Sequence, residues 1–218
     1  MINTFIFDLD GVIVDTAKYH YMAWKRLADE LGYHFDINDN ELLKGVSRRR
    51  SFEIILELND IKMSDEEINK YCTIKNNYYV DYINNLKKEE ILPGVKEFLK
   101  KSKEAGYNIV LGSASKNSKL ILNKLEIMNL FDAIIDGTKV SNAKPDPEVF
   151  LKGAEELNVH PESCIVFEDS AAGISAAHNG NMKAVGVSNP SIKPLCDYYI
   201  DGFINITPEV LVKKVTGE

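Results

Sequence analysis

The chain has 218 residues, of which 44% are hydrophobic, so it can bury a sizeable core as one α/β domain or as a core with an insertion. Lysine and arginine total 26 against 33 aspartate and glutamate, a formal net charge of −7, which argues against nucleic acid or an anionic membrane as a partner. No apolar run approaches the roughly 18 residues that span a bilayer, and the N-terminus lacks the pattern of a signal peptide. Because the three cysteines also form no disulfide or zinc pattern, we expect a cytoplasmic protein.

Two aspartates separated by one residue follow the first apolar run, Phe5-Ile6-Phe7-Asp8-Leu9-Asp10-Gly11. The run predicts a buried parallel strand over residues 3–8. Side chains at i and i+2 of an extended segment point the same way, so Asp8 and Asp10 are expected to project together from the carboxyl end of this strand, where open α/β sheets bind ligands. Two adjacent carboxylates favour a bridging cation or an acid–base pair, although an acidic turn would explain them too.

The pattern is helical from residue 16 to about residue 88. Apolar side chains recur at helical spacing between Thr16 and the stop signal at Gly32. Further helices are predicted over 47–58 and 64–86. Strand-like runs are missing from this stretch of sequence, which predicts an all-helical unit.

Strands alternate with helices in the rest of the chain. The predicted strands cover 108–112, 133–135, 163–167, 183–187 and about 198–204. The predicted helices cover 94–105, 117–126, 146–157, 171–179 and the residues after Thr207. This alternation implies a parallel sheet covered on both faces. We therefore predict an α/β protein with a doubly wound, Rossmann-like core, residues 1–15 and 92–218, and an inserted helical cap, residues 16–91.

Three further polar clusters follow predicted strands. The segment 112–117, Gly-Ser-Ala-Ser-Lys-Asn, offers hydroxyl and backbone N–H groups at a helix N-terminus, where anions bind readily. Lys144 precedes a proline that keeps it out of helical geometry, so it can be held beside a phosphoryl oxygen. Glu168 and Asp169 form an acidic pair of the kind that suits Mg²⁺. Taken singly, these clusters could be a helix cap, an exposed loop lysine and an acidic cap.

The carboxyl ends of parallel strands meet at one edge of a sheet, so the four clusters are expected to converge. Together they supply a carboxylate nucleophile, a second carboxylate, an anion pocket, a lysine and acids for a metal. In phosphoryl transfer the protein mainly positions groups and neutralises charge. The combined inventory therefore predicts an enzyme of phosphoryl transfer.

The order of these motifs resembles that of the haloacid dehalogenase-like phosphotransferases over essentially the whole chain. The motifs are Asp8-x-Asp10-Gly-Val, Ser113-Ala-Ser, Lys144-Pro and Glu168-Asp-Ser. The insertion after the first motif resembles the helical cap of that family. Several segments are similar to the β-phosphoglucomutases in particular, namely 8–16, 19–20, 23–24, 43–48, 75–76 and 113–117. Those enzymes interconvert β-D-glucose 1-phosphate and β-D-glucose 6-phosphate through the 1,6-bisphosphate.

The resemblance implies a role for each matching position of the core. Asp8 attacks phosphorus and becomes an aspartyl phosphate, and Asp10 is the general acid and base. One Mg²⁺ is held by Asp8, the Asp10 carbonyl and Asp169, with Glu168 nearby. The groups implied for the transferring phosphoryl are Ser113, the Ala114 N–H and Lys144. The groups implied for the distal phosphate are Arg48, Ser115, Lys116 and Asn117.

The resemblance also implies that cap residues shape the sugar pocket or its closure. These are Thr16, His20, Lys44, Gly45, Ser51 and Lys75. His20 would serve equally as a half-buried residue of the cap core, and Trp24 fits either the cap core or a sugar platform. Arg49 and Arg50 stand where the mutase pattern has acidic residues, so the sequence leaves open which of three arginines binds the distal phosphate.

A phosphatase of the same fold is the alternative enzyme, with Asp10 activating water against the aspartyl phosphate. A binding protein without turnover is a third possibility, which the presence of both Asp8 and Asp10 disfavours. Lys44, Arg48 and Lys75 favour the mutase, because a mutase must bind two phosphates. For that enzyme we expect Mg²⁺ and glucose 1,6-bisphosphate as cofactors, hexose phosphates as partners and a monomeric state.

Overall fold

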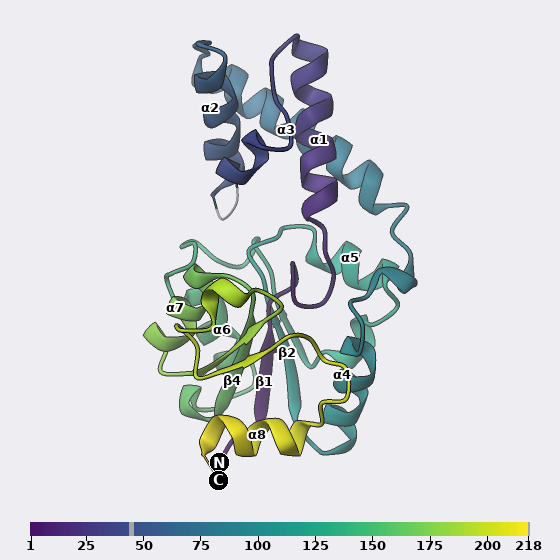
Figure 1. Ribbon diagram of the computed structural model, residues 1–218, viewed down its shortest axis with the longest axis vertical. Helices are drawn as coiled ribbons and strands as arrows, with labels where there is room; N and C mark the ends of the chain where they lie inside the picture. Colours follow the sequence, from purple (N-terminus) through teal and green to yellow (C-terminus); the bar gives the residue numbers. More distant parts are fainter. Residues whose placement is uncertain (44–45, 218) are drawn as a thin grey trace. The chain divides into compact units, whose positions relative to one another are not determined.

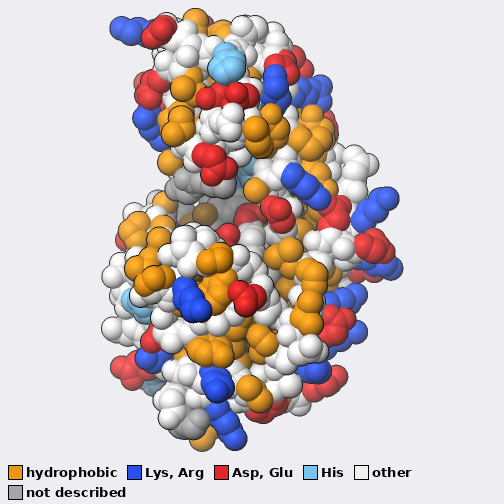
Figure 2. Space-filling view, in the orientation of Figure 1, with side chains coloured by type: hydrophobic (Ala, Val, Ile, Leu, Met, Phe, Trp, Pro, Cys, Tyr) orange, Lys and Arg blue, Asp and Glu red, His pale blue; other side chains and the backbone are white. Residues whose placement is uncertain are grey.

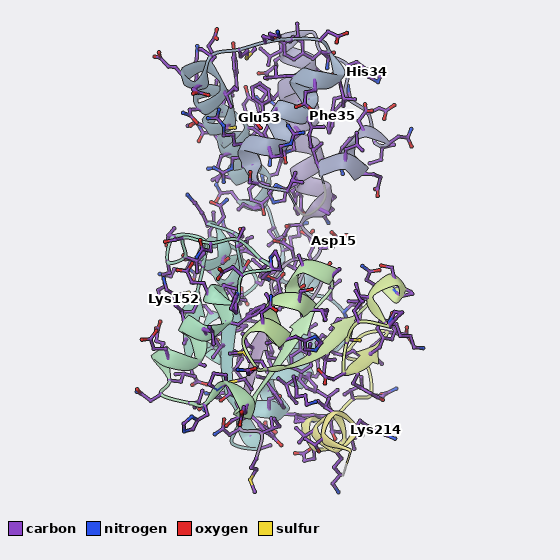
Figure 3. All side chains as sticks on the ribbon, turned by 90° about the vertical axis from the view of Figure 1, so that its left-hand side faces the viewer. Asp15, His34, Phe35, Glu53, Lys152 and Lys214 are labelled. Carbon is purple, nitrogen blue, oxygen red and sulfur yellow. The ribbon has the colours of Figure 1, made fainter. Side chains whose placement is uncertain are left out.

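A computed structural model describes residues 1–43 and 46–217 of the chain. The contacts divide it into two compact units, a core unit of Met1–Asp15 and Leu86–Glu218 and a helical unit of Thr16–Asn85. Residues 86–91, which the sequence assigned to the cap, belong to the core unit. The reason is a pairing between residues far apart in sequence: Ile91 forms an antiparallel bridge with Val14, so the returning chain lies beside the departing one. Asp15, labelled in Figure 3, is the last residue before the helical unit.

The core unit is built on a parallel sheet with strand order β3-β2-β1-β4-β5-β6 (Figure 1). The strands are β1 (Thr4–Phe7), β2 (Asn108–Gly112), β3 (Ala133–Ile135), β4 (Cys164–Glu168), β5 (Lys183–Val187) and β6 (Tyr198–Ile200). The first strand in sequence lies at the centre, paired with β2 on one side and β4 on the other. The order reverses at β1, which makes this the switch point where doubly wound sheets bind ligands.

Helices cover both faces of the sheet, with α6 and α7 on one side and α4 on the other (Figure 1). The core helices are α4 (Val95–Glu104), α5 (Ser118–Lys124), α6 (Glu148–Glu156), α7 (Ala171–Asn179) and α8 (Pro208–Thr216). Short 3₁₀ helices connect them at η2 (Lys88–Glu90), η3 (Met128–Leu130), η4 (Pro161–Ser163) and η5 (Pro190–Ile192). The predicted doubly wound α/β core is thus confirmed.

Alternation along the central strands explains the two hydrophobic layers. Ile6 points to the face covered by α6 and α7, where it packs with Phe150 of α6. Phe5 and Phe7 point to the other face, where their rings lie 5.8 and 6.2 Å from that of Phe98 on α4. Both layers are fully buried, so the strands of the core hold the site residues at their ends on a rigid support.

The helical unit contains α1 (Ala17–Leu31), η1 (Asp39–Leu43), α2 (Arg48–Leu58) and α3 (Asp65–Ile83). Helix α1 ends at Gly32, whose φ of 72° is accessible to glycine without strain. Helix α3 begins with the capping box formed by Ser64 and Glu67. The three helices bury an apolar core of their own that includes Phe35, labelled in Figure 3. The sequence predicted this all-helical composition.

Charged side chains of both signs are interspersed over the face of each unit seen in Figure 2. Within the part of the chain that is described, no helix combines the length and the apolar character needed to cross a membrane.

Candidate active site

Lys144 joins two carboxylates at the carboxyl ends of neighbouring strands. Its Nζ atom donates to Oδ1 of Asp8 across 2.6 Å and also to Oε1 of Glu168. Asp8 follows β1 and Glu168 ends β4, and these strands pair directly. The side chain of Lys144 is 12% exposed, that of Asp8 11% and that of Glu168 1%. The structure thus brings together three residues that the sequence predicted to share one edge of the sheet.

Burial and mutual charge set the protonation of Lys144 and Asp8. Burial disfavours the ammonium form of Lys144, but the charges of Asp8 and Glu168 outweigh it and raise the pKa of the lysine. Burial raises the pKa of Asp8 well above its usual range; Lys144 opposes this rise, while Glu168 and Asp10 add to it. Lys144 therefore stays protonated. The charge of one lysine does not return the pKa of Asp8 to its usual range, so the ionised form of Asp8 needs further positive charge.

Glu168 accepts hydrogen bonds on both of its carboxylate oxygens. Oε1 takes the Lys144 ammonium, and Oε2 takes the N–H groups of Asp169 and Ser170, both at 3.0 Å, and the Ser170 hydroxyl at 2.9 Å. A Cβ built on Gly173 would overlap this carboxylate, so α7 needs glycine at that position. The sequence places Glu168 near a metal, and the structure shows its oxygens taken by protein donors. Its evident task is to orient Lys144 and the start of α7.

Asp169 packs its carboxylate against the turn that follows β1. A Cβ on Gly11 would overlap Oδ2 of Asp169, and Gly11 has a φ of 76°, so glycine is needed there for both reasons. Burial, together with the charges of Glu168 and Asp10, raises the pKa of Asp169 to about 7. An oxygen-rich, partly buried set of acids with raised pKa values has an excess of negative charge. A hard divalent cation such as Mg²⁺ fits this donor set and would lower those pKa values.

The backbone of Asp10 is held by a tight turn. The N–H of Gly11 donates to the carbonyl of Val14 across 2.9 Å. Asp10 is half-buried, and its charge contributes to the raised pKa of both Asp8 and Asp169. The three aspartates are therefore electrostatically coupled at one edge of the sheet, as the spacing of Asp8 and Asp10 suggested.

The loop between β2 and α5 is closed by its own serine side chains. Oγ of Ser113 accepts the N–H of Ser115 at 3.1 Å, and Oγ of Ser115 accepts the N–H of Asn117 at 3.3 Å. Helix α5 has seven residues and is shorter than the predicted 117–126, so its dipole is small. The N–H groups of Ser115 and Asn117 are thus engaged within the loop. The loop residues assigned to phosphates are Ser113, Ala114, Ser115, Lys116 and Asn117.

Two residues that sequence reasoning missed hold the loop of Lys144. Oε2 of Glu148 accepts the N–H groups of residues 141–142, at 2.9 and 2.7 Å. Nδ2 of Asn179 donates to the carbonyl of Pro145 across 3.0 Å. An acid in the first turn of α6 is a signal for such bonds to backbone N–H groups. Nothing local signals the contact of Asn179, because it joins residues far apart in sequence.

Lys75 is buried in the helical unit, where it is 2% exposed. Its Nζ lies 2.7 Å from Nδ1 of His20, 4.7 Å from the ring centre of Trp24 and 5.2 Å from that of Tyr79. The His20 ring stacks on Tyr79 with centroids 4.1 Å apart. Burial, then the charges of Lys75 and Arg48, lowers the pKa of His20 well below its usual value. An ammonium can only donate, so neutral His20 accepts at Nδ1 and carries its proton on Nε2.

The three consecutive arginines at the start of α2 have different surroundings. Nε of Arg49 donates to Glu53, labelled in Figure 3, across 2.8 Å. Arg50 donates to both carboxylate oxygens of Glu57, at 2.6 and 3.1 Å. Among the described residues, Arg48 pairs with no carboxylate. Its guanidinium is exposed, so Arg48 is the candidate that can bind a phosphate without first breaking an ion pair.

The other predicted cap residues have varied surroundings. Trp24 is 3% exposed and belongs to the apolar core of the helical unit, a core position. Ser51 is buried, and its hydroxyl donates to the carbonyl one turn earlier at 3.1 Å. Thr16 is buried at the N-cap of α1. Lys44 and Gly45 lie outside the described residues.

The structure contains a doubly wound sheet, an inserted helical unit and a lysine between two carboxylates. These are features that the resemblance to haloacid dehalogenase-like enzymes led us to expect. The sequence profile of the family described as "Haloacid dehalogenase-like hydrolase" matches residues 5–187. The chain therefore belongs to the haloacid dehalogenase-like family.

Within the family, two phosphoglucomutases and a phosphatase are informative relatives. The chain is 40% identical to the beta-phosphoglucomutase of Bacillus subtilis over 94% of this chain and 92% of that one. A crystal structure of beta-phosphoglucomutase from Clostridium difficile matches with a TM-score of 0.91 and 44% identity, covering 100% of this chain and 98% of that one. The phosphorylated carbohydrates phosphatase of Thermotoga maritima is 32% identical over 83% of this chain and 82% of its own length. The chain is thus an enzyme of this family that is similar both to phosphoglucomutases and to a phosphatase of phosphorylated carbohydrates.

Proposed function

We propose that the protein is a β-phosphoglucomutase, which interconverts β-D-glucose 1-phosphate and β-D-glucose 6-phosphate through an aspartyl phosphate and glucose 1,6-bisphosphate. The observation that supports this choice most strongly is that Arg48, unlike Arg49 and Arg50, pairs with no carboxylate of a described residue. A mutase handles an intermediate with two phosphates and needs ligands for both, whereas a phosphatase needs ligands for one. Similarity to two phosphoglucomutases supports the same choice.

In this proposal Asp8 is the nucleophile that attacks phosphorus. Lys144 already lies on the Asp8 carboxylate, so its ammonium is placed to neutralise charge that builds up on the phosphoryl oxygens. The Ser113 hydroxyl and the Ala114 N–H complete the ligand set for the transferring phosphoryl group. Glu168 keeps Lys144 in position from the opposite side.

Mg²⁺ held by the carboxylates of Asp8 and Asp169 and the carbonyl of Asp10 would supply charge neutralisation for the phosphoryl group. The protein's own contribution is to gather these oxygens against Gly11 and to keep Asp8 ionised for attack. Because burial raises the pKa of Asp8 in the free site, ionisation and cation binding are coupled.

Asp10 is assigned the proton transfers. It gives a proton to the leaving sugar oxygen when Asp8 is phosphorylated, and it takes one from the sugar hydroxyl that attacks the aspartyl phosphate. The same residue can serve both directions because the two steps are related by reversal. The tight turn after β1 fixes its backbone, which limits the positions its carboxylate can reach.

We assign the distal phosphate to Arg48, Ser115, Lys116 and Asn117. Arginine can bind phosphate through a planar fork of donors, which holds two phosphate oxygens at once. The sugar would meet the helical unit through Thr16, His20, Lys44, Gly45, Ser51 and Lys75. Hexose phosphates are the proposed partners of a monomeric, cytoplasmic enzyme.

A sugar-phosphate phosphatase is the alternative, favoured by the identity shared with the Thermotoga maritima phosphatase. The two functions differ in how the aspartyl phosphate decays. A mutase requires catalytic glucose 1,6-bisphosphate and keeps its phosphoenzyme until sugar phosphate arrives. Lifetime of the phosphoenzyme, measured by quenched flow with and without β-glucose 1-phosphate, tests this. Strong acceleration by the sugar supports the mutase, and equally fast hydrolysis without it supports the phosphatase.

A further inference from the structure

Asn189 reaches from the loop after β5 to the backbone of Asp169. Its Nδ2 donates to the Asp169 carbonyl across 2.8 Å. Its Oδ1 accepts the N–H of Ser191 at 3.1 Å and the Ser191 hydroxyl at 2.8 Å. Because the amide oxygen is engaged by an N–H group, the amide nitrogen must face Asp169. Both ends of the Asn189 amide are therefore used.

The loop that carries Asn189 is itself anchored to the sheet. The Asn189 N–H donates to the carbonyl of Val187, the last residue of β5, across 2.7 Å. The preceding Ser188 adopts a φ of 58° and donates its N–H to Ile200 at the end of β6, across 3.0 Å. A left-handed conformation in a residue other than glycine persists only when neighbouring bonds impose it. The amide of Asn189 is thus a fixed donor.

Asp169 is restrained on three sides. Its N–H donates to Oε2 of Glu168 at 3.0 Å, its carbonyl accepts from Asn189, and its carboxylate lies against Gly11. With the peptide groups on both sides fixed, the carboxylate keeps few orientations in the free protein. Ligand oxygens that are already in position reduce the conformational entropy that is lost when a metal binds.

We propose that Asn189 is a positioning residue that sets the divalent-cation affinity of the site by holding the peptide that carries Asp169. The inference rests on the proposed metal-binding role of Asp169. Asn189 acts through that residue, because its bond goes to the backbone carbonyl of Asp169 and not to the carboxylate that is the proposed ligand. Partners that orient metal ligands typically contribute 10- to 100-fold to metal affinity.

Asn189→Asp is the discriminating substitution. It keeps the size of the side chain and an oxygen for Ser191, but it replaces the donor facing Asp169 by an acceptor. We expect about tenfold weaker Mn²⁺ binding, the lower end of the range for such partners. Saturating Mg²⁺ should restore most of the turnover, because the chemistry itself is not touched.

Asn108→Asp is the matched control. Asn108 is half-buried like Asn189, and its Nδ2 also donates to an oxygen, Oγ1 of Thr4 at 3.2 Å. It begins β2, so it lies at the amino ends of the strands, away from the acidic cluster. A general loss of stability would affect both variants, whereas a change of Mn²⁺ affinity is expected for Asn189→Asp alone.

Mn²⁺ binding to the whole protein is measured by electron paramagnetic resonance, in an Asp39→Asn background. That background removes a competing group, since His34, Asp36 and Asp39 of the helical unit are close enough together to hold an ion. Thermal unfolding in EDTA is recorded in parallel. Mn²⁺ binding to Asp169→Asn is measured as well, to identify which part of the binding curve comes from the candidate active site.

Three outcomes are distinct. Weaker Mn²⁺ binding in Asp169→Asn and Asn189→Asp, with Asn108→Asp unchanged, supports the inference. Weaker binding in Asp169→Asn with normal binding in Asn189→Asp overturns the inference and leaves the proposed metal site standing. Normal binding in Asp169→Asn overturns the metal site and the inference together.

Discussion

Lys144 and Asp8 form a buried ion pair of 2.6 Å that ties the loop before α6 to the end of β1. Glu168 shares the same ammonium from β4. One cation thus joins the ends of two paired strands, and any phosphoryl group that reaches Asp8 meets a lysine already in place. Buried pairs of this kind cost desolvation energy, so the presence of the pair is not by itself an argument for stability.

Removal of Lys144 should harm both stability and turnover. Lys144→Met leaves two buried carboxylates without their cation, and breaking such a pair typically costs about 3–5 kcal/mol. Turnover should fall by about 10²–10³, the usual loss of one pre-placed electrostatic group. Denaturant unfolding in EDTA and steady-state rates check the two effects.

The control for that substitution is Lys139→Met, which removes an exposed pair with Glu156 of 2.9 Å. Pairs of this kind are usually worth less than about 1 kcal/mol. Equal losses of stability in the two variants would contradict the structural role given to the Lys144 pair.

Gly173 of α7 should be intolerant of alanine even though alanine favours helices. A Cβ at this position would overlap the Glu168 carboxylate, so Gly173→Ala must displace the group that orients Lys144. We expect a loss of about 1–3 kcal/mol from the overlap, together with a fall in turnover. Denaturant unfolding and rates at saturating Mg²⁺ measure the two.

Gly153 of α6 provides the comparison, because a Cβ there would meet Cγ1 of Val110 at 2.8 Å, an apolar neighbour. Gly153→Ala should also destabilise the protein while leaving the rate of the folded enzyme unchanged. If the two alanine variants lost turnover equally, Glu168 would not be the link between α7 and catalysis.

Arg48→Ala should weaken use of the bisphosphate, because a guanidinium fork that binds phosphate is lost. Charge-assisted hydrogen bonds contribute about 1.5–3 kcal/mol each, so kcat/KM should drop by at least about tenfold. Arg50→Ala, which breaks the pair with Glu57, should change it by less than about twofold. A larger effect of Arg50→Ala in assays of kcat/KM at varied glucose 1,6-bisphosphate would move the distal ligand away from Arg48.

The buried, neutral His20 should make the protein less stable in acid. The pKa of His20 is lowered in the folded protein. Below the ordinary histidine pKa of about 6.5, the unfolded chain therefore binds more protons than the folded protein. The contribution of His20 to the free energy of unfolding is therefore fully present above that pH. It declines as the pH falls, by at most about 1.4 kcal/mol per pH unit.

Unfolding free energies at pH 7.5 and 5.5 test this, with His20→Gln as the variant that cannot titrate. The difference between the two pH values should be smaller in His20→Gln than in the natural protein. An identical pH dependence in both proteins would show that His20 is not held neutral by Lys75 and burial.

Sequence patterns were sufficient for the architecture because burial imposes a period on each element. The strand at 133–135 and the helix at 171–179 were placed at their observed bounds. The helix predicted over 146–157 begins later, at Glu148, because Asp146 and Pro147 form the turn that precedes it. The error at residues 86–91 has a similar origin, since a bridge between distant residues decided that boundary.

Less of the candidate site than of the fold could be predicted from the sequence. Acidic residues at strand ends indicated a cation and a nucleophile, since topology alone brings strand ends together. The use of Glu168 as a hydrogen-bond acceptor, and of Asn189 as a donor to Asp169, depends on tertiary packing. Likewise, the pattern around Lys75 does not predict its burial, because lysine normally keeps its ammonium in water and the ring of Trp24 comes from another helix.

The most direct test follows β-glucose 1-phosphate with Mg²⁺ and a trace of glucose 1,6-bisphosphate, with glucose 6-phosphate and free phosphate quantified in the same tube. For a mutase we expect glucose 6-phosphate to accumulate with little free phosphate, and omission of the bisphosphate to slow the reaction. Release of free phosphate without glucose 6-phosphate would contradict the mutase and make the enzyme a phosphatase.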